Sequence, residues 1–496
     1  MDIRKYVFRT LLAMPPVIAP AAGPLGNEPM KRPALLASLL LALTLAGLGL
    51  PAPALSREPV ASTGVIGVRE AQLDPAYWIG RQKQAGKVVL DDKAIAAQNA
   101  RLQTADPSVY DLEGLPQTLD GAQVRTWVEA LSKRPDKTLY DANGKEGTQR
   151  QVDKLIASLN LKDIPDTQVT RYGLVTRRAD LRTFPSRLRV FNAPGNTDID
   201  RFQESALFPG TPVVIAHVSR DREWWFVVSN TYAAWVERES VAEGSKQQVF
   251  GYAGRTPYLV VTGATARTVF TPEQPQVSDL QLDMGVRVPL LADWPADRLV
   301  NGQYPYTAHV IELPARDKDG GLVLVPALMP RTQDVATDYL PLTRANLLRQ
   351  SFKFLGERYG WGHSYNARDC SGFVSEIYRS FGVQLPRNTR DQAVSPALNR
   401  FTFGPDDSHA RRVEVMKTLQ VGDLVYIPGH VMMVIGQEKD GPYVIHDTTG
   451  ITYRKTDGEL TRAPLNGVSV TPLMPLLFNE SQPTIDRITS IQRIRP

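Results

Sequence analysis

The chain has 496 residues but only one cysteine, Cys370, so no internal disulfide bond can hold its fold together. Apolar residues after Cys370 recur at helical spacing as far as Phe381 and stop before Gly382. This pattern predicts a helix with Asp369 as its N-cap and Cys370 in its first turn. The positive end of the helix dipole favours a thiolate there, although a buried cysteine can also serve as a small hydrophobic residue.

The N-terminal part has the plan of a secretory signal. Lys31 and Arg32 precede an apolar run over residues 34–50, and small residues follow it. We expect a signal peptide over residues 30–54, preceded by an upstream extension over 1–29, with export to the periplasm or cell envelope. A membrane anchor is the alternative, but the run is short for a span, so no stable membrane anchor is expected after cleavage.

The charge of the chain limits its partners. The net charge of +5 is spread along the sequence rather than clustered. It does not indicate a nucleic-acid partner, but it suits an anionic polymer such as a cell wall. Exported chains usually use cysteines in pairs, so an unpaired thiol in such a chain calls for a reason. Catalysis is the simplest reason, and no cofactor is expected.

The length predicts several domains rather than one core. Residues 75–165 carry apolar residues at helical spacing and predict a small helical N-terminal domain. Residues 167–245 and 250–330 consist of short β-rich runs separated by turns, with a hairpin turn predicted at Asp317–Gly321. Residues 340–477 place helices before strands, which predicts an α+β domain.

Aromatic residues mark the first β-rich segment. Trp224–Trp225 open a predicted strand after a turn, and Trp235 follows one hairpin later. This arrangement resembles the bacterial SH3-like modules attached to cell-wall enzymes, and we expect both β-rich segments to be β-barrel SH3-like domains. The tryptophans fit a barrel core better than a ligand platform, and His217 inside a strand is expected to be structural.

A thiol nucleophile needs a base and a third polar group that fixes the ring of that base. His430 and His446 lie on adjacent predicted strands, where they can be neighbours on the sheet face that receives the cysteine helix. We assign His430 as the base and His446 as the orienting group for Cys370. Each histidine alone also fits a structural role. The three residues could also be zinc ligands, but no closely spaced histidine pair is present and no metal is expected.

Five motifs of the C-terminal segment fit one known family. They are Tyr359–Gly362, Asp369–Phe373, Leu385–Thr389, Gly422–Val425 and Gly429–Val431. Together they resemble the NlpC/p60-type papain-like cysteine peptidases, which cut cell-wall peptides. The resemblance implies a papain-like catalytic domain over about residues 340–477. The upstream plan, a helical segment and two SH3-like barrels, is also similar to that of some members.

The resemblance implies hydrolysis of the bond between γ-D-glutamate and a diamino acid, usually meso-diaminopimelate, in peptidoglycan stem peptides. Cys370 would attack the γ-carbonyl and form a thioester, and His430 would protonate the leaving amine and then activate water. The backbone N–H of Cys370, together with Tyr359, would stabilise the oxyanion. By motif position, the residues lining the substrate cleft would be Tyr359, Ser371, Asn388 and Thr389.

One position departs from the family pattern. In relatives that trim released peptides, an aspartate at the position of Asn388 recognises the free amine of L-alanine, and asparagine cannot form that ion pair. Action on stems still attached to glycan therefore stays open. Three other functions also stay open: an N-acetylmuramoyl-L-alanine amidase, a non-catalytic cell-wall-binding protein, and an acyltransferase that uses the same cysteine and histidine. The presence of Cys370, His430 and His446 together disfavours the non-catalytic one.

Overall fold

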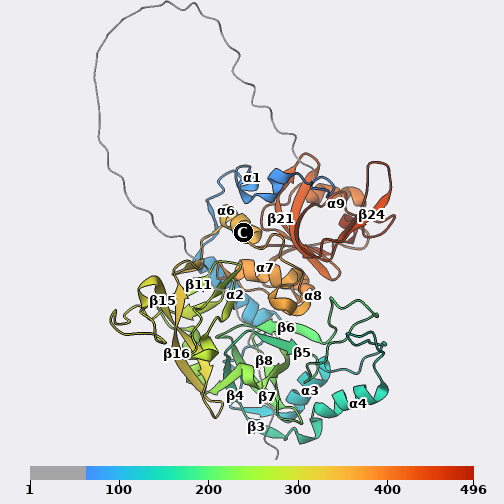
Figure 1. Cartoon of the computed structure of the whole chain (residues 1–496). Coiled ribbons are helices and arrows are strands. Elements are labelled where there is room, and N and C mark those ends of the chain that lie inside the picture. The colour runs from blue at the N-terminus through green and yellow to red at the C-terminus, as the bar shows by residue number, and fades with distance from the viewer. Residues whose placement is uncertain (1–62, 496) are drawn as a thin grey trace, which may run out of the picture. The chain divides into compact units, whose positions relative to one another are not determined.

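The computed structural model of the chain describes residues 63–495 (Figure 1). The signal peptide and the upstream extension predicted over residues 1–54 lie outside the described residues. All described residues belong to one unit of the chain, Pro59–Pro496. Within 63–495, none of the helices is long and apolar enough to cross a membrane.

The N-terminal segment contains four helices: α1 (Pro75–Ile79), α2 (Asp92–Ala105), α3 (Gly121–Leu131) and α4 (Gln149–Ser158). Trp78 of α1 and Ile95 of α2 belong to the hydrophobic core of the C-terminal unit. Val128 of α3 and Leu155 of α4 belong to the core of the first β-rich unit instead. The small helical N-terminal domain predicted over 75–165 is therefore not confirmed, because its apolar faces pack on two different neighbours.

Short strands hold this segment against the rest of the chain. They are β1 (Val88–Leu90), which pairs with β18 (Leu342–Thr343), and β2 (Thr118–Asp120), which pairs with β3 (Thr167–Val169). The N-terminal segment therefore supplies one strand to each of two small sheets, and the other strand of each sheet comes from a later part of the chain.

The first β-rich unit is a seven-stranded antiparallel sheet in the order β10-β4-β7-β8-β9-β5-β6. The strands are β4 (Arg171–Val175), β5 (Ala179–Arg182), β6 (Gln203–Leu207), β7 (Pro212–Val218), β8 (Trp224–Val228), β9 (Ala233–Glu237) and β10 (Val241–Gly244). Trp224–Trp225 and Trp235 are at most 4% exposed, so their predicted place in the core is confirmed. His217 is buried and its Nε2 lies 3.0 Å from the carbonyl oxygen of Leu159, which fits the structural role. The end strands β10 and β6 do not pair within the described sheet, so a closed barrel is not confirmed.

The second β-rich unit follows α5 (Lys246–Ala253) and consists of three small sheets. The strands are β11 (Tyr258–Val261), β12 (Thr265–Arg267), β13 (Gln281–Asp283), β14 (Arg287–Pro289), β15 (Ala308–Arg316), β16 (Leu322–Pro330) and β17 (Val335–Ala336). Strands β15 and β16 pair over their whole length, which confirms the hairpin turn predicted at Asp317–Gly321. The barrel predicted over 250–330 is not confirmed, and β17, which pairs with β11, extends the unit beyond residue 330.

The C-terminal unit packs helices on a six-stranded antiparallel sheet in the order β19-β26-β20-β21-β22-β25. The helices are α6 (Arg344–Phe352), α7 (Cys370–Arg379), α8 (Thr389–Val394) and α9 (His409–Met416). The strands are β19 (Asn399–Thr402), β20 (Leu424–Ile427), β21 (His430–Glu438), β22 (Gly441–Thr448), β25 (Gly467–Pro472) and β26 (Ser490–Arg493), with a hairpin of β23 (Ile451–Arg454) and β24 (Leu460–Ala463). Because β26 pairs with both β19 and β20, the sheet extends beyond the predicted boundary at residue 477.

Helix α7 is the element that carries the cysteine, and its apolar side fixes its place. Phe373, Val374 and Ile377 share one buried cluster with Val431 and Met433 of β21. In Figure 1, α1 lies beside β21, where Trp78 packs on the sheet. The cysteine helix and the N-terminal helix α1 thus share one core.

We predict that Trp78→Ala destabilises the C-terminal unit by about 3–5 kcal/mol, because a large buried side chain leaves a cavity. Trp78 is fully buried, its ring centroid lies 5.2 Å from that of Tyr443, and its Nε1 donates to the carbonyl of Gln72 at 2.8 Å. Denaturant unfolding followed by circular dichroism measures the effect. Tyr306→Ala is the control, since Tyr306 is 82% exposed and should change stability little. Equal stability of the two variants would contradict the shared core.

Candidate active site

The cysteine stands at the first residue of α7 because Asp369 caps the helix. The Asp369 Oδ1 accepts a hydrogen bond from the backbone N–H of Gly372 at 2.8 Å. Cys370 is 5% exposed, and its sulfur lies 3.6 Å from Oγ1 of Thr389, the first residue of α8. The predicted helix start and cap are therefore confirmed.

The resting thiol is neutral in this environment. Burial, followed by the charge of the neighbouring Asp369 carboxylate, raises the pKa of Cys370 to about 12. The Thr389 hydroxyl and the backbone N–H of Val431 act in the opposite direction and lower that pKa. The sequence predicted that the helix start would favour a thiolate, but burial and the charge of the capping carboxylate raise the pKa of the thiol instead. To act as a nucleophile, this thiol would therefore need a base that removes its proton.

The two predicted histidines are in contact. His430 Nε2 and His446 Nδ1 are 2.8 Å apart, and His446 Nε2 lies 3.0 Å from Oγ1 of Thr471. Burial lowers the pKa of His430 to about 4, so its ring is neutral and able to accept a proton. Among the described residues, no hydrogen bond joins the Cys370 sulfur to either ring in this resting arrangement, as is common before substrate binds.

The histidines lie on a different face of the sheet from the one predicted. Side chains alternate along β21, so His430 shares its side with Met432, which belongs to another core cluster. The body of α7 packs on the alternate residues, such as Val431 and Met433. The expectation that the two histidines are neighbours is confirmed, but the expectation that they lie on the sheet face that receives the cysteine helix is wrong. Only the first turn of α7, where Val431 N–H influences the sulfur, approaches the start of β21.

The structure places the residues predicted to line the cleft in different surroundings. Tyr359 is 9% exposed, and burial together with the nearby thiol of Cys370 raises its pKa, so its hydroxyl keeps its proton. Ser371 is 3% exposed, and its Oγ donates to Asp369 Oδ1 at 3.2 Å. Asn388 Nδ2 donates to the carboxylate of Asp391 at 2.9 Å. Ser371 therefore helps to fix the capping carboxylate. The roles of Tyr359, Ser371 and Asn388 toward substrate remain predictions.

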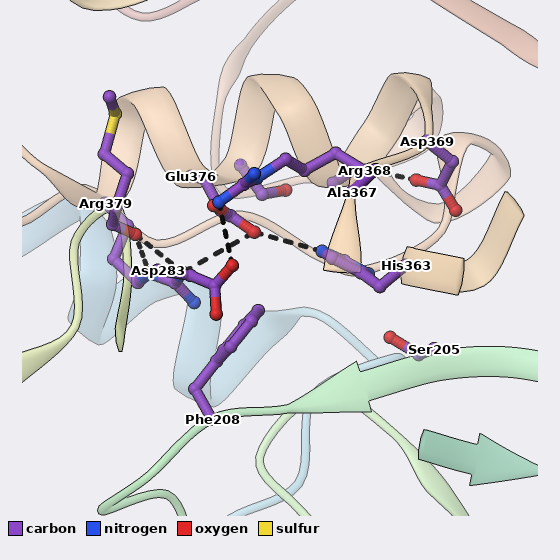
Figure 2. A network of polar contacts seen from close by, with 12 residues as sticks. Ser205, Phe208, Asp283, His363, Ala367, Arg368, Asp369, Glu376 and Arg379 are labelled. Atoms are coloured by element: carbon purple, nitrogen blue, oxygen red, sulfur yellow. Dashed lines mark hydrogen bonds and ion pairs between the residues drawn. The ribbon is translucent and has the colours of Figure 1, made fainter. Parts of the chain in front are cut away.

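A buried ion network lies beside the cysteine helix α7 (Figure 2). Arg368 is 0% exposed, and its Nε donates to Glu376 Oε2 at 2.8 Å. Its Nη1 donates to both carboxylate oxygens of Glu357 at 3.0 and 2.8 Å. Its Nη2 donates to Asp283 Oδ1 at 2.8 Å and to the Ala264 carbonyl at 2.6 Å. Arg368 directly precedes the cap Asp369, and its contacts with Asp283 and Ala264 connect the start of the cysteine helix to the second β-rich unit.

A second arginine holds the cap itself. Arg387 Nη2 donates to Asp369 Oδ2 at 2.8 Å and to His363 Nδ1 at 3.0 Å, and its Nε donates to Ser205 Oγ of β6 at 2.6 Å. Burial opposes ionisation of Asp369, yet the charge of Arg387 holds the pKa of that carboxyl down to about 2. Because Arg387 donates to Nδ1, the ring proton of neutral His363 lies on Nε2, which faces Glu376 at 3.1 Å (Figure 2). The capping carboxylate is therefore charged and fixed from the first β-rich unit.

Sequence reasoning missed several of these residues. Arg387 was quoted only as part of a motif, and Arg368, His363 and Thr471 were given no role. Their partners lie 8–182 residues away in the chain, and a periodic pattern within one helix or strand connects none of them. A signal that could have drawn attention to Arg368 is its place next to Asp369, since adjacent opposite charges in an apolar helix start need partners.

Asp447, the residue after His446, was also missed. It is 0% exposed, and neither carboxylate oxygen has a hydrogen-bond partner among the described residues. Burial, together with the charges of Asp369 and Glu357, raises its pKa to about 9. Its charged form would raise the pKa of Cys370. Asp447 is therefore a neutral acid at pH 7.

The described residues contain no group of three or more His, Cys, Asp or Glu side chains that could hold a metal ion. The zinc interpretation of Cys370, His430 and His446 therefore gains no support from this part of the chain.

The fold and the site define a hydrolase-type domain in which a helix-start thiol stands near a pair of hydrogen-bonded histidines on a sheet. Residues 356–469 match the model of the NlpC/P60 family, and residues 189–237 match the model of the SH3 domain (SH3b1 type). The region similar to the NlpC/P60 family thus lies in the C-terminal unit, and the region similar to an SH3 domain of the SH3b1 type precedes it. The suspected family and domain content are thus confirmed.

The chain is also similar to individual proteins. The gamma-D-glutamyl-L-lysine dipeptidyl-peptidase of Bacillus cereus (strain ATCC 10987 / NRS 248) is 28% identical over 218 residues, which cover 41% of this chain and 54% of that protein. The matched region thus spans about half the length of this curated relative. An NlpC/P60 endopeptidase from Photobacterium damselae subsp. piscicida has a similar structure, with a TM-score of 0.65, 20% identity and coverage of 81% of this chain and 90% of that chain. An NlpC/P60 family protein from Bacillus cereus ATCC 10987 has a TM-score of 0.42 and 20% identity, covering 66% of this chain and 100% of that chain.

We predict that Thr389→Val makes the thiol of Cys370 less reactive, because the hydroxyl is the side chain that lowers its pKa. A hydrogen bond of about 1 kcal/mol corresponds to alkylation by iodoacetamide that is about three- to tenfold slower at one pH. Thr389→Ser keeps the hydroxyl and should react like the wild type. An unchanged alkylation rate with weaker substrate binding would instead support the predicted place of Thr389 in the cleft.

We predict that Asp447→Asn stabilises the protein at neutral pH. The unfolded carboxyl, with its ordinary pKa of 3.8, loses its proton above about pH 4, whereas the folded one holds it up to about pH 9. Wild-type stability is therefore lost as pH rises through this window, and asparagine removes the loss. The variant should gain about 2–4 kcal/mol at pH 7, and the gain should grow from pH 5 to pH 8 in denaturant unfolding. Asp440→Asn, at an exposed position, is the control. A gain that does not change with pH would show that Asp447 is already ionised in the folded protein.

Proposed function

We propose that this protein is an exported cysteine endopeptidase that hydrolyses the bond between γ-D-glutamate and a diamino acid in peptidoglycan stem peptides. The observation that carries the proposal is the combination of a capped helix-start thiol with the 2.8 Å contact between His430 and His446. The NlpC/P60 domain and the name of the Bacillus cereus relative support the same class of bond. Export rests on the signal-like segment at residues 30–54.

The chemistry begins with transfer of the thiol proton of Cys370 to His430. His430 Nε2 faces His446, so the proton would be received on Nδ1. The sulfur then attacks the γ-carbonyl carbon, and the resulting oxyanion would be stabilised by the backbone N–H of Cys370 and the hydroxyl of Tyr359. Tyr359 suits this task because its raised pKa keeps it a hydrogen-bond donor.

The second half of the reaction releases the two products. His430 gives its proton to the leaving amine of the diamino acid as the C–N bond breaks, which leaves a thioester on Cys370. Water then attacks the thioester, His430 accepts a proton from that water, and it returns this proton to the sulfur as the C–S bond breaks, which restores the thiol. Both groups begin and end the cycle neutral, as their pKa values in the resting site require.

The diamino acid that we favour is meso-diaminopimelate, and L-lysine is the other candidate because of the relative's name. The amine end of the substrate is a separate question. The Asn388 amide donates to Asp391, so asparagine is engaged with a neighbouring carboxylate. A neutral side chain at 388 fits stems whose L-alanine is still attached to glycan, which have no free amine.

We predict that the purified protein releases a peptide that begins with the diamino acid and leaves L-Ala-γ-D-Glu behind. Mass spectrometry of peptidoglycan fragments, with glycan-linked and free stems side by side, measures both the bond and the stem preference. Cys370→Ala should lower the rate by at least about 10³-fold, because the nucleophile is gone. Cleavage at the wild-type rate by this variant would exclude the thioester mechanism, and cleavage before L-alanine would indicate an amidase.

The histidines give a graded test of the same mechanism. His430→Ala should be almost as inactive as the cysteine variant, whereas His446→Ala should lose less, since an orienting group acts through the base. Circular dichroism of each variant controls for folding. Full activity of His446→Ala would show that another group orients His430.

A further inference from the structure

The two histidines of the site share a single hydrogen. His430 Nε2 and His446 Nδ1 are 2.8 Å apart, so one of these nitrogens donates and the other accepts. Burial lowers the pKa of both rings, and the neighbouring His430 lowers that of His446 further. Both rings are therefore neutral at rest, and each carries one N–H.

The state of this pair depends on one more group. His446 Nε2 lies 3.0 Å from Oγ1 of Thr471, on the neighbouring strand β25. Thr471 is 0% exposed and His446 is 2% exposed, so water does not reach this nitrogen freely. A threonine hydroxyl can accept a hydrogen bond or donate one. The contacts from Thr471 through His446 to His430 can therefore hold their protons in two arrangements.

Only one of the two arrangements makes His430 a base. If Thr471 accepts, the His446 proton is on Nε2, its Nδ1 accepts from His430 Nε2–H, and the lone pair of His430 Nδ1 is free for the thiol proton. If Thr471 donates, His446 carries its proton on Nδ1, and His430 must accept on Nε2. The His430 proton then lies on Nδ1, and that nitrogen cannot take a proton from Cys370.

We propose that Thr471 is a positioning residue, whose hydroxyl accepts from His446 Nε2–H and thereby holds both histidine rings in the tautomers that leave His430 Nδ1 free. The inference rests on the proposed function, since it concerns the same base. Thr471 would thus act together with Cys370, His430 and His446. It contacts neither the thiol nor, in the mechanism above, the substrate.

Replacement of the hydroxyl has a defined consequence. In Thr471→Val, a proton on His446 Nε2 would be a buried donor without a partner, which is unfavourable. Moving it to Nδ1 gives it a partner in His430 Nε2, so the inactive arrangement becomes favoured. Thr471→Ser keeps the hydroxyl and should keep the active arrangement.

The test reads the tautomers directly. The full chain is labelled with ¹⁵N-histidine, and two-bond ¹H–¹⁵N correlation spectra show which ring nitrogen carries the proton; the chain has six histidines. We expect protonated Nε2 on both His430 and His446 in the wild type and in Thr471→Ser, and protonated Nδ1 on both in Thr471→Val. Thr448→Val is the matched control on β22, because the Thr448 hydroxyl contacts Gly450 and no histidine contact is seen for it in the described chain.

Kinetics on a stem-peptide fragment gives the second readout. Thr471→Val should lower kcat by about tenfold or more, with KM changed by less than about twofold, and Thr471→Ser should restore most of it. Wild-type protein with protonated Nδ1 on His446, or Thr471→Val with unchanged tautomers, would overturn the proposal. A Thr471→Ser variant that behaves like Thr471→Val would overturn it as well. If the wild type has the expected tautomers but cleaves no stem peptide, the proposed function fails while the role of Thr471 stands.

Discussion

The buried guanidinium of Arg368 is the interaction on which the site most depends. All of its nitrogens donate hydrogen bonds, to Glu376, Glu357, Asp283 and the Ala264 carbonyl, and none of the side chain is exposed. A buried charge of this kind is tolerable only while every partner stays in place. Because these partners come from α7, from the loop before the cysteine and from the second β-rich unit, they must all stay in register for the helix start to hold its position.

Burial also sets the charge states of Cys370 and His430 in the proposed reaction. It makes the thiol of Cys370 a weak acid and His430 a weak base, so neither is charged before substrate binds. The capping carboxylate of Asp369 stays charged chiefly because the positive charge of Arg387 lowers its pKa. A second negative charge at Asp447 would oppose thiolate formation, and the raised pKa of that carboxyl avoids it at neutral pH. In the proposed mechanism, proton transfer would therefore take place within a site whose surrounding charges are already balanced.

Sequence patterns could predict the parts of the site that depend on local periodicity. Helical spacing after Cys370 and the position of Asp369 gave the helix and its cap, and the period of two along the strands brought His430 and His446 together. The face of the sheet was predicted wrongly, because alternation tells which residues share a side but not which side α7 covers. The partners of Arg368 and the place of β26 could not be predicted, since ion pairs and strand order connect residues that are far apart in the chain.

The contacts of Arg387 bear on what the first β-rich unit does. Its Nε is bonded to Ser205 on β6, and its Nη2 is bonded to the Asp369 carboxylate that caps the cysteine helix. A wall-binding module on a flexible tether could move away without affecting the nucleophile. Here, separation of the first β-rich unit from the C-terminal unit would remove the hydrogen bond between Ser205 and the buried Arg387. Arg387 would then be held less firmly beside Asp369, whose ionisation depends on its charge. The SH3-type unit is therefore part of the framework of the catalytic helix, whatever it also binds.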